Sequence, residues 1–130
     1  MKEAYKKQGI FSWCELMTDN VDTALAYYQS VIGWDVETME MAEMTYHVVK
    51  VDGNPVGGIM GKPPGAEQAP NHWGTYITVD DVDQTLAKAE SMGGKAMFPP
   101  MDVAGVGRMC AIMDPTGAVV SIITYEENVE

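Results

Sequence analysis

The sequence predicts an α+β fold built from two βαβββ modules. Two observations lead to this prediction. A unit of strand, helix cap, helix and glycine occurs twice, and segments that alternate apolar with polar residues follow each copy. Two copies of about 60 residues fit a duplicated half-domain better than a solenoid, which needs three or more short repeats.

The first copy covers residues 13–34. Apolar residues recur at helical spacing over residues 21–32, which predicts a helix there. Asp19 and Asn20 precede this segment and can accept hydrogen bonds from its first free backbone N–H groups. Gly33 follows the segment, where a left-handed residue ends a helix at the lowest cost.

The second copy begins at Gly74. When Asn20 is aligned with Asp81, at an offset of 61 residues, Leu25 aligns with Leu86 and Gly33 with Gly94. The apolar helical spacing returns over residues 82–92. A second helix is therefore predicted in this range.

The remaining periodic segments predict eight strands, four in each module. The expected strands are residues 10–17, 34–41, 45–51, 56–60, 73–79, 95–98, 108–113 and 119–124. Residues 1–130 are expected to form a single domain, with a first module at 9–60 and a second at 73–125. Residues 61–72, rich in proline and glycine, are the expected linker, and residues 1–8 are expected to be a loose arm.

Composition excludes several kinds of function. The net charge is −11, with only eight lysines and arginines, so no nucleic-acid partner is expected. The chain contains no run of 18 apolar residues, so no membrane span is expected. No apolar run follows the charged N-terminal residues, so no signal peptide is expected. The expected location is therefore cytoplasmic. Cys14 is interpreted as a small core residue, and the two cysteines form no metal-binding spacing.

Four segments carry a family resemblance: FSWCELMTDN, AYYQSVIGW, HWGTYITVDDVD and DPTGAVVSII. Together with the repeat, they resemble the vicinal oxygen chelate superfamily over about residues 9–125. This superfamily contains glyoxalase I, bleomycin-resistance proteins, extradiol dioxygenases and methylmalonyl-CoA epimerase, and the chain is similar to a glyoxalase-related subgroup of it. The resemblance implies eight strands in a partly open mixed β-barrel or cup, with the helices outside. It also implies a small-molecule ligand inside the cup and a homodimer.

The superfamily holds a divalent metal with histidine and glutamate at fixed strand positions. Matched by motif, these positions fall here on Trp13, Gly57, Gly74 and Ser121. Indole, glycine and a neutral hydroxyl are poor ligands for such a cation, so no metal and no other cofactor are expected. A shift of two residues would place Glu15 or Tyr76 in the cup instead, and Glu15 could then be a ligand.

Strand alternation places Phe11, Trp13, Glu15 and Met17 on one face of the first strand, which is expected to line the cup. Seven residues are the predicted ligand-binding set: Trp13, Glu15, Tyr46, Trp73, Tyr76, Arg108 and Ser121. Glu15 is the candidate catalytic residue, as a general base. The alternative is a structural pair between Glu15 and Arg108, so a structural and a ligand-contacting Glu15 both stay open.

Two functional hypotheses follow. The first is a small-molecule-binding protein of the glyoxalase and bleomycin-resistance kind, without the metal, in which inward aromatic side chains hold a planar or cationic ligand. The second is a glyoxalase-related lyase or isomerase that acts on a small oxygenated metabolite, with Glu15 as base. The sequence leaves open whether the chain is an enzyme.

Overall fold

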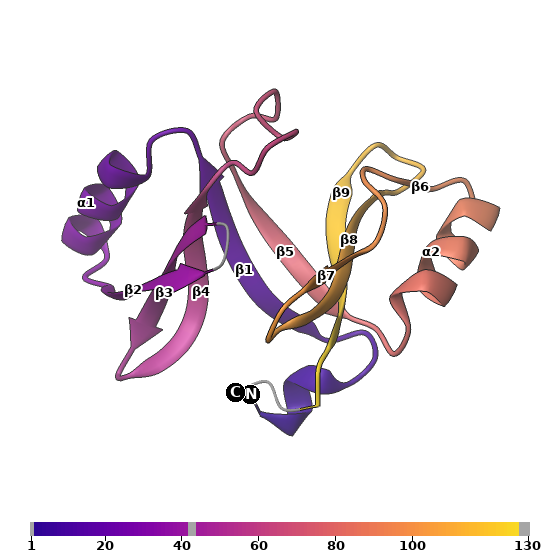
Figure 1. The fold of residues 1–130 in the computed structure, drawn as a ribbon, viewed down its shortest axis with the longest axis horizontal. Helices are drawn as coiled ribbons and strands as arrows, with labels where there is room; N and C mark the ends of the chain where they lie inside the picture. Colours follow the sequence, from indigo (N-terminus) through magenta and orange to yellow (C-terminus); the bar gives the residue numbers. More distant parts are fainter. Residues whose placement is uncertain (1, 42–43, 128–130) are drawn as a thin grey trace. The chain divides into compact units, whose positions relative to one another are not determined.

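The computed structural model describes residues 2–41 and 44–127. It confirms the α+β class and the order βαβββ in the first module, and it adds one strand to that order in the second (Figure 1). The first module comprises β1 (Phe11–Thr18), α1 (Val21–Val31), β2 (Asp35–Met41), β3 (Met44–Val51) and β4 (Asn54–Gly61). The second comprises β5 (His72–Thr78), α2 (Val82–Ser91), β6 (Lys95–Ala96), β7 (Met101–Val103), β8 (Gly107–Met113) and β9 (Val119–Tyr125).

Within the described residues the structure has nine strands, one more than the eight expected. The additional strand is β7, whose three residues pair antiparallel with β8. It lies between a Pro-Pro pair and a glycine-containing turn. Three residues are too few for an alternating pattern to be recognised, so periodicity did not predict it.

The chain divides into two compact units. One unit spans Trp13–Gly74, and the other combines the segment up to Ser12 with the chain from Thr75 onward. In the first, the strand order is β2-β3-β4-β1, with β1 and β4 parallel and the other neighbours antiparallel. In the second, the order β5-β9-β8-β6 repeats this arrangement, with β5 and β9 parallel.

Each module has its own apolar core between its sheet and its helix. In the first, Leu16, Val49 and Ile59 are buried, and apolar residues of α1 pack against them. In the second, the buried residues are Val79, Val82, Cys110 and Ile122, with Leu86 of α2 packed beside them. The helices therefore cover one face of each sheet, as their apolar stripes predict.

Of the two candidate caps of the first helix, Asn20 is confirmed, whereas Asp19 accepts a hydrogen bond from Asn71 instead. The repeat counterpart of Asn20, Asp81, caps the second helix. The side chain of Asn20 accepts a hydrogen bond from Thr23 N at 3.1 Å, and that of Asp81 accepts one from Gln84 N at 3.0 Å. Each cap satisfies a backbone donor that the first turn of a helix cannot satisfy internally. The matching caps confirm the alignment on which the repeat was based.

Two expectations from the sequence are wrong. Of the expected loose arm, residues 2–8 are ordered against the second module: they include the 3-10 helix η1 (Glu3–Lys6), and Tyr5 O accepts a hydrogen bond from Thr78 Oγ1. Gln8 adds a bond from Asp80 N to its side-chain oxygen. Cys14 is exposed rather than part of the core.

Among the helices of the described residues, none is long and apolar enough to cross a membrane.

Candidate functional site

The face of the first-module sheet that points away from α1 is called the open face here. Successive side chains of a strand point to opposite faces, and Leu16 of β1 belongs to the core beneath α1. Trp13 and Glu15 therefore project onto the open face, as the alternation predicted. Glu15 is nevertheless buried, with a relative exposure of 6%.

A directed chain of hydrogen bonds connects three of the predicted residues on this face. The indole Nε1–H of Trp13 donates to Tyr46 Oη at 2.8 Å, and the hydroxyl of Tyr46 donates to Glu15 Oε1 at 2.7 Å. An indole N–H can only donate, so the hydroxyl proton of Tyr46 is directed at the carboxylate. We call this the Trp–Tyr–Glu chain, and it fixes the orientation of all three side chains.

Gly58 makes this chain possible. In the parallel register of β1 and β4, Gly58 lies directly beside Glu15. A Cβ atom on Gly58 would lie 1.8 Å from Tyr46 Oη, because the ring of Tyr46 reaches from β3 across β4 to Glu15. Sequence reasoning missed this residue, although a glycine inside a strand commonly marks such a close approach.

The same register corrects one motif assignment. Tyr76, the repeat partner of Glu15, pairs with Ser121 of β9. The counterpart of Ser121 in the first module is therefore Gly58 rather than Gly57. Alignment on turn glycines failed because a register shift between Val49 and Lys50 interrupts the β3–β4 hairpin.

The second module carries different chemistry at the corresponding place. Tyr76 is buried, and its hydroxyl points to the sulfur of Met109 at 4.0 Å. Met109 corresponds to Tyr46, since each lies two residues before the strand partner of Ser121 or Gly58. A phenol and a thioether thus stand where the first module has a carboxylate and a phenol.

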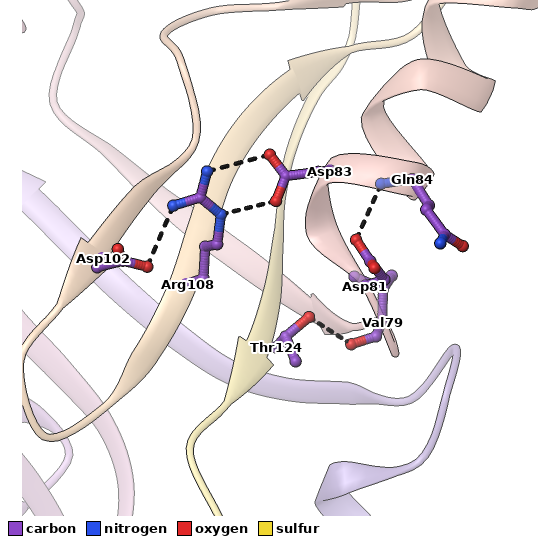
Figure 2. A network of polar contacts seen from close by, with 7 residues as sticks. All are labelled: Val79, Asp81, Asp83, Gln84, Asp102, Arg108 and Thr124. Atoms are coloured by element: carbon purple, nitrogen blue, oxygen red, sulfur yellow. Dashed lines mark hydrogen bonds and ion pairs between the residues drawn. The ribbon is translucent and has the colours of Figure 1, made fainter.

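Arg108 is engaged in a different contact from the predicted pair with Glu15 (Figure 2). Its Nε and Nη2 donate to the two carboxylate oxygens of Asp83 at 2.7 and 3.0 Å, and its Nη1 donates to Asp102 at 3.2 Å. The hydrogen bond from Arg108 lowers the pKa of Asp83 below its ordinary value, and both aspartates raise the pKa of Arg108. The interpretation of Arg108 as a structural partner of Glu15 is therefore corrected.

An open hollow lies beside this ion-pair cluster, at the start of α2. Its lining residues are Asp80, Asp81, Val82, Asp83, Arg108 and Thr124. The side chain of Asp81 caps the helix, and Thr124 Oγ1 donates to Val79 O (Figure 2). The polar groups of this hollow thus serve the local structure, and we do not assign it a ligand.

Trp73 lies in an aromatic cluster rather than in the Trp–Tyr–Glu chain. Its indole donates to Tyr28 Oη at 3.1 Å, and its ring contacts those of Tyr28 and Trp34 edge-on. Tyr28 and Trp34 are stacked with centroids 5.5 Å apart. The structure therefore joins Trp13, Glu15 and Tyr46 and places Trp73 with side chains of the α1 region.

The residues at the positions of the superfamily metal do not fit a divalent cation. The indole of Trp13 is a donor that is already bonded to Tyr46. Gly58 and Gly74 offer no side-chain ligand, and a neutral Ser121 hydroxyl does not replace imidazole or carboxylate. Over residues 2–41 and 44–127, no group of three or more histidine, cysteine, aspartate or glutamate side chains is arranged to hold a metal ion.

Comparison with known proteins identifies relatives of this chain. CFP32 of Mycobacterium tuberculosis, provisionally named a glyoxylase, is 44% identical over 117 residues, which cover 88% of this chain and 44% of CFP32. The anthracycline biosynthesis protein DnrV of Streptomyces peucetius is 28% identical over 127 residues, covering 88% of this chain and 46% of DnrV. The chain thus spans about half the length of the curated relatives it matches.

Solved structures share the fold at low sequence identity. A hypothetical protein of Bacillus halodurans superposes with a TM-score of 0.67 at 10% identity, covering 95% of this chain and 99% of that one. A Streptomyces coelicolor methylmalonyl-CoA epimerase variant, in complex with 2-nitronate-propionyl-CoA, gives 0.65 at 16% identity with the same coverage. The family model described as Glyoxalase/Bleomycin resistance protein/Dioxygenase superfamily matches residues 10–122. The chain belongs to this superfamily.

Proposed function

We propose that this chain is a metal-independent small-molecule-binding protein of the glyoxalase and bleomycin-resistance kind. The ligand binds on the open face of the first-module sheet, against Trp13, Glu15 and Tyr46. The Trp–Tyr–Glu chain is the single observation that supports this proposal most. It fixes an aromatic surface beside a buried carboxylate before any ligand arrives, which reduces the entropy lost on binding.

The chemistry of these side chains favours a planar or cationic ligand. The indole of Trp13 offers a stacking surface and a cation–π partner. The carboxylate of Glu15 adds negative charge in a poorly solvated position, and the net charge of −11 attracts cations to the protein as a whole. The proposed complex forms in the cytoplasm. For Trp73, Tyr76, Arg108 and Ser121, ligand contact remains a prediction.

A titration with doxorubicin tests the proposal, because this anthracycline is planar and carries a protonated amine. Binding is measured by the quenching of tryptophan fluorescence and by the rise in melting temperature. Glu15→Gln and Tyr46→Phe should each weaken binding about 10-fold or more, the effect of losing one charge-assisted hydrogen bond. Glu37→Gln and Tyr27→Phe are matched controls, because they change an exposed carboxylate and an exposed phenol in the same unit. Equal affinities for all four variants would contradict the proposal.

Metal independence is tested separately. The protein is purified without chelator or metal-affinity resin, and its metal content is measured by elemental analysis. We expect less than stoichiometric zinc, nickel, manganese or iron, and unchanged doxorubicin affinity after dialysis against EDTA. One equivalent of tightly bound metal per chain would refute this part of the proposal.

A lyase or isomerase is the second candidate, and the Tyr46–Glu15 hydrogen bond favours it. A buried carboxylate with a fixed donor is suited to accept a proton from a carbon acid. The hemithioacetal of methylglyoxal and glutathione is the test substrate, followed by absorbance. Turnover that disappears in Glu15→Gln and persists in Glu37→Gln would establish this alternative over pure binding.

A further inference from the structure

We infer that a row of methionines makes the open face of the first module a site for fused polycyclic aromatic cations of more than one ring shape. The row, called the methionine row here, crosses the four strands of the module and consists of Met39, Tyr46, Met60 and Met17. The inference rests on the proposed function, since it concerns the same face, and it adds the residues that determine the class of ligand.

The strand registers place these four side chains in line. Met39 of β2 is the partner of Tyr46 of β3, and the antiparallel register of β3 and β4 places Tyr46 opposite Met60. Met60 is in turn the partner of Met17 in the parallel pair of β4 and β1. Residues directly opposite each other in neighbouring strands lie on the same face of the sheet. Neighbouring strands lie about 4.8 Å apart, so the row extends over roughly 14 Å, which suits a fused ring system better than a single ring.

The two faces of the same strands are built from different kinds of apolar residue. On the face beneath α1, the buried residues are the branched Leu16, Val49 and Ile59. On the open face, Met17 and Met60 directly follow two of them in the sequence. Branched side chains have few rotamers and specify one packing arrangement, whereas the unbranched thioether of methionine adapts to different shapes and contacts aromatic rings favourably. The core face thus fits one helix, and the open face is suited to ligands of different shapes.

The row is accessible at its β2 end, and further methionines extend it there. Met39 has a relative exposure of 46%, and Met17 is half-buried. Met41 and Met44 are paired at the next open-face position of β2 and β3, and both are half-buried. Five of the eleven methionines of the chain therefore share this one face.

The second module shows that the fold does not require methionine in this row. Thr78 and Ile123 are paired there as Met17 and Met60 are paired in the first module. A hydroxyl and a branched side chain thus satisfy the same strand pairing. The methionines of the first module need another explanation, and contact with a ligand supplies one.

Glu15 determines the sign of the ligand charge. In the row of residues beside the methionine row, Glu37 lies on β2 and Glu15 on β1. Glu37 forms an ion pair with Lys50, whereas the hydrogen bond that Glu15 accepts from Tyr46 brings no positive charge. A ligand whose rings lie along the methionine row can place its cationic group against Glu15, where low exposure strengthens the attraction.

Isothermal titration calorimetry with five probes tests the class of ligand. Doxorubicin, ethidium and 9-aminoacridine are fused polycyclic cations of three shapes. Anthraquinone-2-sulfonate is a flat anion, and benzylamine is a cation with a single ring. The wild type should bind the three polycyclic cations with dissociation constants within about 10-fold of one another, and the other two probes at least 10-fold more weakly.

Variants of the row test the role of the methionines. Met39→Gln and Met17→Thr should each weaken binding of all three polycyclic cations about 2- to 10-fold, the effect of losing one sulfur–aromatic contact. Met39→Ile keeps the position apolar but less adaptable, so the three affinities should differ by more than 10-fold. Met101→Gln is the matched control, because Met101 pairs with Met109 as Met39 pairs with Tyr46 and has a similar exposure of 49%. It should leave binding unchanged.

Four results would overturn the inference. They are unchanged affinities in Met39→Gln and Met17→Thr with an intact fold by circular dichroism, equal loss in Met101→Gln, binding of only one of the three polycyclic cations, and equal binding of anthraquinone-2-sulfonate. If the wild type binds the cations and Glu15→Gln does not, while the methionine variants bind as the wild type does, the inference fails and the proposed function stands. If the wild type binds none of the probes, both fail.

Discussion

The two modules share a strand arrangement but differ in the side chains at one pair of equivalent positions. In the first, Glu15 lies beside Gly58 and accepts a hydrogen bond from Tyr46. In the second, Tyr76 lies beside Ser121 and its hydroxyl meets a thioether. The strand arrangement therefore does not require Glu15, and a role in binding is a better explanation of this residue than a role in the fold.

One glycine of each module, Gly58 in the first and Gly107 in the second, leaves no room for a Cβ atom, but different atoms occupy that space. Gly107 of β8 faces backbone: a Cβ atom there would lie 2.1 Å from Thr124 O and 2.8 Å from Tyr125 Cα. Gly58 of β4 faces the end of the Tyr46 side chain. A backbone strand cannot move aside without breaking its ladder, whereas a tyrosine can rotate away. Gly107 is thus needed for the close approach of β8 and β9, and Gly58 is needed for the position of Tyr46 in the candidate site.

The largest effect is expected for Gly107→Ala. The added methyl group must push β9 away from β8, so the free energy of unfolding should fall by roughly 3 kcal/mol. Urea denaturation followed by circular dichroism measures the change. A loss below about 1 kcal/mol, within the range of ordinary substitutions, would show that β9 adjusts freely and would remove the contrast between the two glycines.

Gly58→Ala should lower the free energy of unfolding by a smaller amount, about 1–3 kcal/mol, because the displaced Tyr46 loses its hydrogen bonds to Trp13 and Glu15. The substitution should also change the emission of Trp13, whose indole loses its acceptor. A double-mutant cycle isolates the cause: in a Tyr46→Ala background, Gly58→Ala should cost almost nothing. Ser121→Ala, at the equivalent position of the second module, is the control. If Gly58→Ala lowers the free energy of unfolding as much in the Tyr46→Ala background as in the wild type, the added methyl group clashes with the backbone and not with Tyr46.

Most of the fold could be predicted from the sequence because its local patterns agree with one another. The caps, the apolar stripes and the alternating strands all point to the same βαβββ order, and the repeat checks each module against the other. The exceptions are local. Strand β7 was missed because three residues carry no period, and Cys14 was assigned to the core although its place in β1 leaves it exposed.

The candidate site was harder to predict, because its contacts join residues distant in sequence. Alternation alone places Trp13 and Glu15 on one face, but the bond between Tyr46 and Glu15 depends on Gly58. Arg108 was one candidate partner of Glu15, and its actual partner Asp83 was not predicted for a similar reason. A carboxylate in the first turn of α2 was available in the motif VDDVD, but nothing in the spacing shows that β8 runs past it.

The ion pairs of Arg108 should matter less than either glycine, because they are exposed to solvent. Arg108→Gln should lower the melting temperature slightly and speed amide exchange in α2, whose first turn Asp83 anchors. Exchange in α1 should stay unchanged, and 1 M NaCl should reduce the difference from wild type. Asp22→Asn, at the repeat position of Asp83, is the control. Faster exchange in both helices would contradict the separation of the modules.

The smallest effect concerns pH and the two hairpin turns. Asp114 accepts bonds from Thr116 Oγ1, Thr116 N and Ala118 N, and these bonds lower its pKa from 3.8. A carboxyl whose pKa is lower in the folded state stabilises that state above its unfolded pKa, and the contribution is lost as pH falls through the folded pKa. The β3–β4 turn relies instead on backbone conformation, with Asp52 and Gly53 at positive φ. Protection factors measured from pH 5 to pH 2 should therefore fall earlier in the β8–β9 turn, and Asp114→Asn should remove that pH dependence. An equal fall in both turns would mean that acid acts on the whole protein instead.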